Sequence, residues 1–146
     1  GSIGTRHLAT ALISCSSLSS LCLAATQMAD DGATSLSLSL AGMRCLSYLN
    51  LASSSIGDSG ASALAQQLHR HTSIGSLLLS DNSFGDSGAA ELSRIVRNSS
   101  ALRELGISRN NIGDDGAAAI AEALATCPIL TILDMGMNRI GADGIE

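Results

Sequence analysis

The sequence predicts an α/β solenoid in which about five units of 28 residues, each a strand followed by a helix, stack side by side. Three observations predict this fold: apolar residues that recur every 28 residues, a period-two alternation that follows them, and a column of glycines in the same phase. We expect a horseshoe segment with a parallel sheet on the concave face and helices on the convex face.

The first half of each unit is expected to be a strand. Units begin at residues 18, 46, 74, 102 and 130 and open with the pattern L-x-x-L-x-L, which is clearest in 102–107. Residues two apart on a strand face the same side of a sheet, so the apolar positions face the core and the residues between them face solvent. Stacked units must place their central leucines as neighbouring rungs, which are Leu21, Leu49, Leu77, Leu105 and Leu133.

The second half of each unit has helical spacing. Apolar residues lie four and eight positions after each repeat glycine, as Leu64 and Leu68 do after Gly60, and they form one stripe on a helix. The segment 35–40 alternates like a strand, but its register with the other units predicts a helix. Helices are wider (~10 Å) than the ~4.8 Å between strands, which predicts the curvature. The glycine column consists of Gly4, Gly32, Gly60, Gly88, Gly116 and Gly144.

Two polar columns are expected to stabilise the turns. Asn82, Asn110 and Asn138 follow the strands, where an amide can bridge the backbone groups of successive turns. Thr26 and Ser54 can do this only partly, which predicts a less rigid N-terminal half. A second column lies just before the helices, where a carboxylate can cap free N–H groups; it consists of Asp30, Asp58, Asp86 and Asp114. Because neighbouring aspartates belong to different units, we favour capping over a metal or catalytic role.

Composition excludes several classes of function. The net charge is −5 and all 8 basic residues are arginines, which argues against nucleic acid or an anionic membrane as a partner. The lack of lysine excludes P-loop and Schiff-base lysine chemistry within this chain. The four cysteines form no C-x-x-C pair, which favours reduced thiols and a cytoplasmic protein. We expect Cys15, Cys45 and Cys127 to be buried fillers and Cys22 to face outward.

No arrangement of residues predicts an enzyme, a cofactor or a metal site. The segments 57–60 and 85–88 read Gly-Asp-Ser-Gly, as in serine proteases, but they recur at the repeat interval and end on repeat glycines. His69 and His71 flank Arg70 at the end of an expected helix, where residues two apart do not share a face. Their position favours a helix C-terminus over a metal pair.

The outward strand positions and the strand exits are the candidate protein-binding surface. The surface is small and polar at its N-terminal end and becomes larger and more charged toward the C-terminus. Tyr and Arg are among the residue types enriched at interfaces. The candidate contact residues are Tyr48, Asn50, Leu78, Asp81, Glu104, Arg109, Ile132, Asp134 and Met137.

The pattern L-x-x-L-x-L-x-x-N-x-I-G-D-x-G-A, matched by residues 102–117, resembles the ribonuclease-inhibitor-like class of leucine-rich repeats. The resemblance covers essentially the whole chain and implies a leucine-rich-repeat solenoid. Most members of the class are intracellular and bind proteins along the concave sheet. The chain departs from the class at Thr26 and Ser54 in place of Asn, at Ala29 in place of a turn Gly, and at Ala142 in place of Asp. Its scarcity of aromatic residues is a further departure.

We therefore expect a non-catalytic module that binds another protein. One alternative is a GTPase-activating domain, because the class includes the Ran GTPase-activating protein; Arg109 and Arg139 would then be the residues near the phosphates. Another alternative is a structural scaffold segment of a larger receptor or cytoskeletal assembly. We expect residues 1–146 to form a single array that is a fragment of a longer one. Its ends would then contact further repeats of the same chain or pair between chains.

Overall fold

The computed structural model describes residues 1–126 and 129–141, in which helices and strands alternate along the chain. The elements are α1 (Ser2–Leu12), β1 (Ser20–Cys22), α2 (Ala29–Leu40), β2 (Tyr48–Asn50), α3 (Asp58–Leu68), β3 (Ser76–Leu78), α4 (Asp86–Asn98), β4 (Glu104–Gly106), α5 (Asp114–Thr126) and β5 (Ile132–Asp134). Each strand begins two residues after a predicted unit start. Gly144, Ala142 and Cys127 lie outside the described residues.

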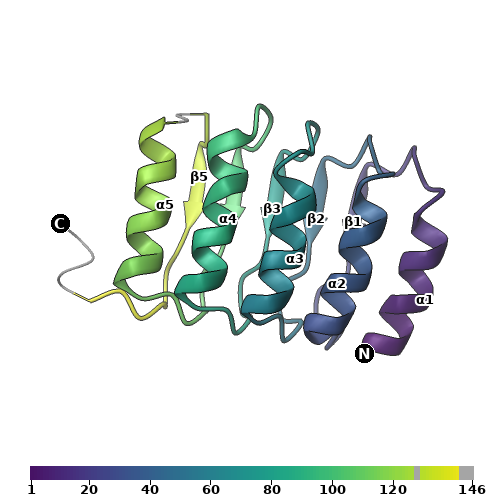
Figure 1. Ribbon diagram of the computed structural model, residues 1–146, viewed down its shortest axis with the longest axis horizontal. Helices are drawn as coiled ribbons and strands as arrows, with labels where there is room; N and C mark the ends of the chain where they lie inside the picture. The colour runs from purple at the N-terminus through teal and green to yellow at the C-terminus, as the bar shows by residue number, and fades with distance from the viewer. Residues whose placement is uncertain (127–128, 142–146) are drawn as a thin grey trace.

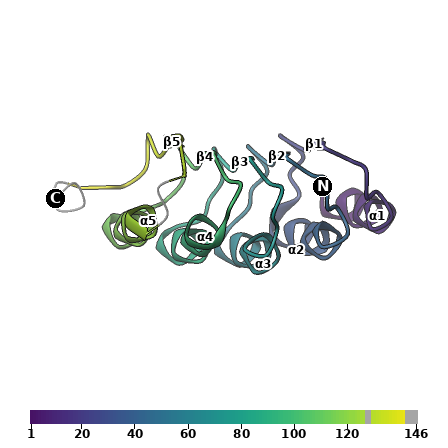
Figure 2. The same ribbon diagram turned by 90° about the horizontal axis from the view of Figure 1, so that it is seen from above.

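The strands form one parallel sheet in the order β1-β2-β3-β4-β5, and the helices form a second layer beside it (Figure 1). Viewed from above, the two layers follow a shallow arc with the strands on its inner side and the helices on its outer side (Figure 2). The register pairs each central leucine with the next, from Leu21 with Leu49 to Leu105 with Leu133. The predicted α/β solenoid with a concave sheet and convex helices is therefore confirmed.

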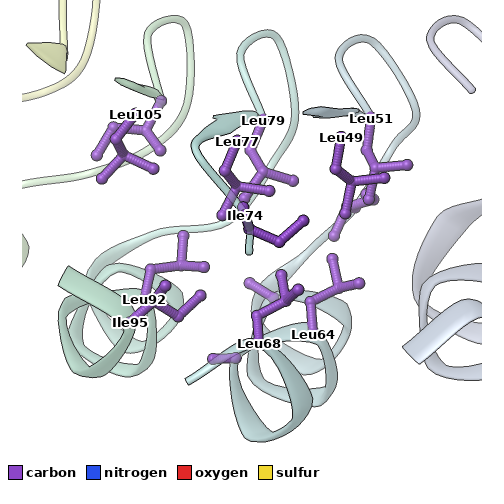
Figure 3. Close-up of a cluster of buried hydrophobic side chains, with 14 of the residues drawn as sticks. Leu49, Leu51, Leu64, Leu68, Ile74, Leu77, Leu79, Leu92, Ile95 and Leu105 are labelled. Atoms are coloured by element: carbon purple, nitrogen blue, oxygen red, sulfur yellow. The ribbon is translucent and has the colours of Figure 1, made fainter. Parts of the chain in front are cut away.

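The core lies between the two layers and is almost entirely aliphatic. Leu49 and Leu77 of the sheet and Leu64 of α3 are completely buried. Figure 3 shows these side chains and those of neighbouring units converging from strand and helix. Burying a leucine contributes about 1.5–3 kcal/mol, and each unit repeats the contribution. Phe84 is the one aromatic side chain in this cluster and is also completely buried.

The segment that alternates like a strand is helical, as its register predicted. Leu36 and Leu40 are buried, whereas Leu38 between them is 69% exposed on the outer side of α2. The buried serines are satisfied within the helix, because Ser37 Oγ donates to Thr34 O at 2.7 Å and Ser39 Oγ donates to Leu36 O at 2.7 Å. The stacking interval therefore overrides the local period of two.

The last described strand is less buried than the others. Leu133 is 37% exposed, whereas its counterparts Leu77 and Leu105 are 0% and 1% exposed. Among the described residues β5 has a neighbouring strand on one side only. No helix of the described residues has the length and apolar character needed to cross a membrane.

The cysteines follow the sequence predictions in part. Cys22 is exposed on the sheet, as expected, and Cys15 packs partly buried against the core. The prediction that Cys45 is buried was wrong, because the adjacent Leu46 occupies the buried position and leaves the thiol exposed.

Candidate functional site: the concave strand face

The concave face consists of the strand residues that flank the central leucines and of the residues at the strand exits, where the chain turns away from the sheet. The sheet register places equivalent residues of successive units side by side, 28 positions apart. In the part of the chain that the structure describes, helices cover only the other side of the sheet (Figure 2). The first column of this face is Ser20, Tyr48, Ser76, Glu104 and Ile132, and the second is Cys22, Asn50, Leu78, Gly106 and Asp134. The third is Ala24, Ala52, Ser80, Ser108 and Gly136, and the strand exits are Ala25, Ser53, Asp81, Arg109 and Met137.

All the candidate contact residues lie on this face, with different degrees of exposure. Tyr48, Asn50, Leu78 and Glu104 are partly buried by neighbours in the sheet. Three others, Asp81, Arg109 and Asp134, are exposed. Two apolar side chains at the C-terminal end are open to solvent, Ile132 at 54% and Met137 at 72% exposure. Two of these residues contact each other: Asn50 Nδ2 donates a hydrogen bond to Tyr48 Oη at 3.3 Å.

Three carboxylates of the concave face are held by serine hydroxyls of other units. Ser53 Oγ donates to Asp81 Oδ2 at 2.7 Å, and Ser76 Oγ donates to Glu104 Oε2 at 2.5 Å. Farther along, Ser108 Oγ donates to Asp134 Oδ2 at 2.8 Å. Charge-assisted bonds of this kind fix the orientation of a carboxylate. The sequence analysis did not find these pairs, although a serine 28 residues before an acid was a usable signal for two of them.

Gly106 makes one part of the concave face flatter than the sequence suggests. The glycine is buried, and a Cβ built on it would lie 3.1 Å from Leu78 Cδ2 and 3.2 Å from Ser80 Oγ. The side chain of Leu78 therefore lies over Gly106, and the apolar surface extends toward the fourth strand.

The strand exits have an unusual backbone conformation. Ala25, Ser53, Asp81, Arg109 and Met137 all have positive φ, between 53° and 58°, and none is glycine. This left-handed region is uncommon for residues with a Cβ. It recurs at the same position in every unit, and it turns the chain away from the sheet at the edge of the concave face. The sequence pattern gave no indication of it.

The asparagine column bridges the turns of successive units. Asn82 Oδ1 accepts hydrogen bonds from Ser54 N at 3.0 Å and Ile56 N at 2.9 Å, while Nδ2 donates to Leu51 O at 3.1 Å and Leu79 O at 2.9 Å. Asn138 makes the equivalent bonds to the turn that contains Asn110. One amide thus satisfies two donors and two acceptors that the sheet leaves unpaired.

Two members of the column depart from this arrangement. Asn110 is 7% exposed and donates to Leu79 O, Ile107 O and Ser108 O, but its Oδ1 is buried without a hydrogen-bond partner. Ser54, which replaces an asparagine, is 0% exposed and donates to Leu23 O at 3.1 Å. Its hydroxyl thereby reproduces the donor half of the asparagine interaction.

The aspartate column acts across units, which differs from the sequence prediction. Asp58, Asp86 and Asp114 are the first residues of their helices and do not precede them. Asp58 Oδ1 accepts from Gly85 N at 2.8 Å and Gly88 N at 2.7 Å, both at the start of the next helix. A Cβ on Gly88 would lie 2.9 Å from that oxygen and 2.8 Å from Phe84 Cβ. The glycine column therefore leaves room for a carboxylate from the preceding unit, which caps the following helix.

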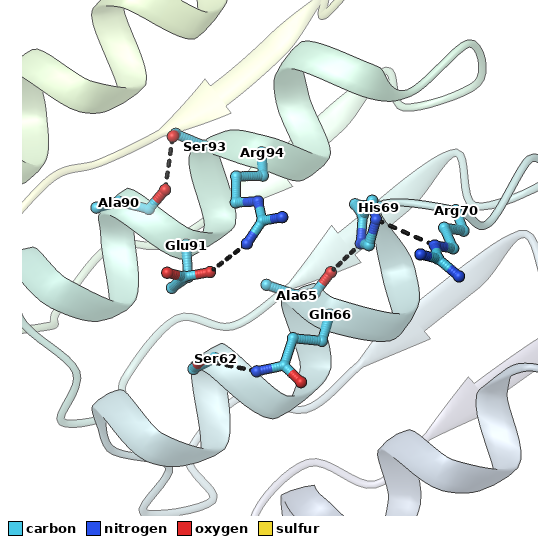
Figure 4. A network of polar contacts seen from close by, with 9 residues as sticks. All are labelled: Ser62, Ala65, Gln66, His69, Arg70, Ala90, Glu91, Ser93 and Arg94. Atoms are coloured by element: carbon cyan, nitrogen blue, oxygen red, sulfur yellow. Dashed lines mark hydrogen bonds and ion pairs between the residues drawn. The ribbon is translucent and has the colours of Figure 1, made fainter.

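The residues considered for chemistry are dispersed. Ser59 and Ser87 of the Gly-Asp-Ser-Gly segments are exposed at the starts of α3 and α4. His69 Nδ1 lies 3.1 Å from Ala65 O, and its Nε2 accepts from Arg70 Nε at 3.3 Å (Figure 4). Within residues 1–126 and 129–141 no three His, Cys, Asp or Glu side chains are arranged to hold a metal ion. Arg109 and Arg139 are exposed in neighbouring units, and their role in a GTPase-activating domain stays a prediction.

Comparison with known proteins identifies the repeat and the fold. The family model described as Leucine Rich repeat matches residues 42–65, 98–121 and 126–146. The solved structure of leiomodin-1 actin-binding site 2 is similar over 94% of this chain and 78% of its own, with 16% identity and a TM-score of 0.73. A tropomodulin C-terminal domain from Caenorhabditis elegans is similar over 97% of this chain and 86% of its own, with 15% identity and a TM-score of 0.76. A search of curated proteins finds no match.

Proposed function

Because this chain is a leucine-rich-repeat protein with the 28-residue strand–helix unit of the ribonuclease-inhibitor-like class, we propose that it is a non-catalytic module that binds another protein through its concave face. The observation that carries the proposal is the concave face itself. It presents four ordered columns of side chains on a sheet whose opposite side is covered by helices. A rigid array of this kind suits a partner surface better than a small substrate.

The chemistry of the concave face favours a partner with a basic surface. Three fixed carboxylates, Asp81, Glu104 and Asp134, stand against one guanidinium, Arg109, among the candidate contact residues. Charge complementarity raises the association rate and the specificity of a protein interface. Tyr48 and Leu78 supply apolar area near the middle of the face, and Ile132 and Met137 supply it at the C-terminal end.

The first defined partner to test is actin, since a solved structure with this fold bears the description of an actin-binding site. Cosedimentation with filamentous actin and a gel-shift assay with monomeric actin would measure binding directly. The likeness to that structure concerns the fold alone, and a chain that binds no actin would leave the concave face open to partners with a basic surface. We place the interaction in the cytoplasm, in line with the free thiols of Cys15, Cys22 and Cys45.

The test of the concave face is a comparison of variants against one partner. Tyr48→Ala combined with Glu104→Arg removes a contact side chain and reverses a charge, and we expect it to weaken binding at least tenfold. The control is Arg94→Glu on α4, which changes charge on the convex side, where Arg94 pairs with Glu91 at 3.1 Å. If the concave variant binds as well as the wild type and the convex control loses binding, the interface lies outside the concave face. That result would favour a scaffold role.

A further inference from the structure

A cavity of about 370 Å³ lies between the turns that lead from α2 to β2 and from α3 to β3. These turns form the edge of the solenoid opposite the strand exits (Figure 1). The cavity is therefore separate from the concave face. Its lining is Ala41, Arg44, Gln67, Arg70, His71 and Thr72.

The cavity exists because two neighbouring units differ at this edge. Ala41 and Gly42 occupy the positions that His69 and Arg70 occupy one unit later. A Cβ on Gly42 would lie 2.7 Å from Ile13 O, so the first turn cannot carry a side chain there. Arg70 and Ala41 line the same cavity, so the side chain of Arg70 lies beside a turn whose own residues there are small. Figure 4 shows the Arg70 side chain next to His69.

Hydrogen bonds between the two turns make the walls of the cavity rigid. His71 Nε2 donates to Met43 O at 2.9 Å, since a carbonyl can only accept. Ser73 Oγ lies 2.8 Å from both Arg44 O and Leu46 O. The backbone that carries Arg44 is thus fixed to the backbone that follows Arg70.

The two arginines are not needed to cap the helices. In α2 the carbonyls of Ser39 and Leu40 already accept from Gly42 N and Met43 N, each at 3.1 Å. In α3 the carbonyls of Ala65 and Leu68 accept from backbone amides in the same way. The positive charges therefore remain available to a ligand.

Among the residues that the structure describes, no carboxylate lines this cavity. The ion pair found among the described residues joins Arg94 to Glu91, so neither Arg44 nor Arg70 is paired with a described acid. Arg70 Nε donates to His69 Nε2 at 3.3 Å, which orients the guanidinium and leaves its terminal nitrogens as donors. Two unpaired guanidinium groups beside one cavity are notable in a chain whose net charge is −5.

We propose that this cavity binds a phosphate monoester. A monoester dianion matches two guanidinium groups in charge, and a guanidinium donates two parallel hydrogen bonds to phosphate oxygens. The Gln67 amide and the Thr72 hydroxyl are further donors in the lining. A volume of 370 Å³ exceeds what a bare phosphate fills and lies in the range of about 300–1,000 Å³ for small-ligand sites, so the ester also has an organic part.

The experiment is an NMR titration of the whole chain with inorganic phosphate, phosphoserine and adenosine monophosphate at constant ionic strength. We expect saturable shifts confined to the amides of residues 41–44 and 67–73. Arg44→Gln and Arg70→Gln should each raise the Kd about tenfold, the effect of losing one charge-assisted contact. Both side chains are exposed, so the variants should keep the wild-type circular dichroism.

The matched controls are Arg94→Gln and Arg97→Gln, which remove one positive charge from exposed positions of α4. Unchanged affinity in both controls supports the cavity as the binding site. Tighter binding of phosphoserine than of adenosine monophosphate indicates that the natural ligand is a phosphorylated protein side chain. The reverse order indicates a free metabolite. Shifts that never saturate, or a loss in the α4 controls equal to that in Arg70→Gln, would overturn the proposal. Neither result bears on the concave face.

Discussion

The turn at Asn82 and the turn at Ser54 occupy equivalent positions in neighbouring units, yet they are stabilised differently. Asn82 joins two amides and two carbonyls with one side chain. Ser54 donates to carbonyls, at 3.1 Å to Leu23 O and at 3.0 Å to Ala52 O, and lies 3.4 Å from the hydroxyl of Thr26. The asparagine side chain therefore pairs with both amides and carbonyls of the backbone, whereas the serine side chain pairs with carbonyls of the backbone.

The backbone differs along with the side chain. The turns that begin at Ala25 and Ser53 contain additional left-handed residues, Gln27 at φ 51°, Ala29 at 53° and Ser55 at 60°. Among the described residues, the turns with asparagine have positive φ only at the strand exit itself. Turns with an asparagine at this position therefore contain fewer residues in the left-handed region, which is strained for residues with a Cβ. The N-terminal units keep the same strand register with these additional left-handed residues.

Replacing Asn82 should have the largest effect on stability. Asn82→Ala leaves the amides of Ser54 and Ile56 and the carbonyl of Leu51 without their partner. The carbonyl of Leu79 keeps the bond from Asn110 Nδ2 at 3.1 Å. We expect a loss of about 3 kcal/mol in the free energy of unfolding, measured by chemical denaturation. Amide hydrogen exchange should accelerate at Ser54 and Ile56 before it does elsewhere. An unchanged exchange rate at both amides would show that the bridge does not stabilise the preceding turn.

Replacing Asn110 should cost less than replacing Asn82, although the residues are equivalent. The amide nitrogen of Asn110 is fully used, but its Oδ1 has no partner, so the substitution leaves no donor unpaired. The carbonyls of Leu79, Ile107 and Ser108 each lose one hydrogen bond and keep another. We expect Asn110→Ala to lower the free energy of unfolding by about 2 kcal/mol. A loss equal to that of Asn82→Ala would mean that the oxygen of Asn110 is bonded in solution.

The sequence predicted the fold and the residues of the concave face because both depend on positions that recur. Leu49 and Leu77 had to become adjacent rungs once a 28-residue unit was recognised, and the alternation assigned Tyr48 and Glu104 to the outer side. Contacts between different columns were not predicted. Asp58 was expected to cap its own helix, but stacking brings it to Gly85 and caps the next one. Such contacts depend on the offset between units, which the period does not specify.

Replacing Ser54 should have a smaller effect than either asparagine. Ser54→Ala removes a buried hydroxyl that donates to the carbonyl of Leu23, and the amides that an asparagine would satisfy are not involved. We expect a loss of about 1 kcal/mol, the contribution of one hydrogen bond. Ser59→Ala, at an exposed position of α3, is the matched control and should leave the midpoint of denaturation unchanged. A loss of 3 kcal/mol or more, on the order of an asparagine bridge, would remove the distinction between the two kinds of turn.

The backbone difference can be measured with one substitution made at two equivalent positions. Ser55 has φ 60°, a conformation that glycine adopts at no steric cost, whereas Ser83 lies outside the left-handed region. We expect Ser55→Gly to raise the free energy of unfolding by about 0.5 kcal/mol. Ser83→Gly should lower it by about as much, because glycine adds freedom to the unfolded chain and the bond from Ser83 Oγ to Ile56 O is lost. If the free energy of unfolding rises in Ser55→Gly and falls in Ser83→Gly, two sites 28 residues apart, the difference is due to the conformation of the turn. If it falls in both variants, the serine turn carries no backbone strain.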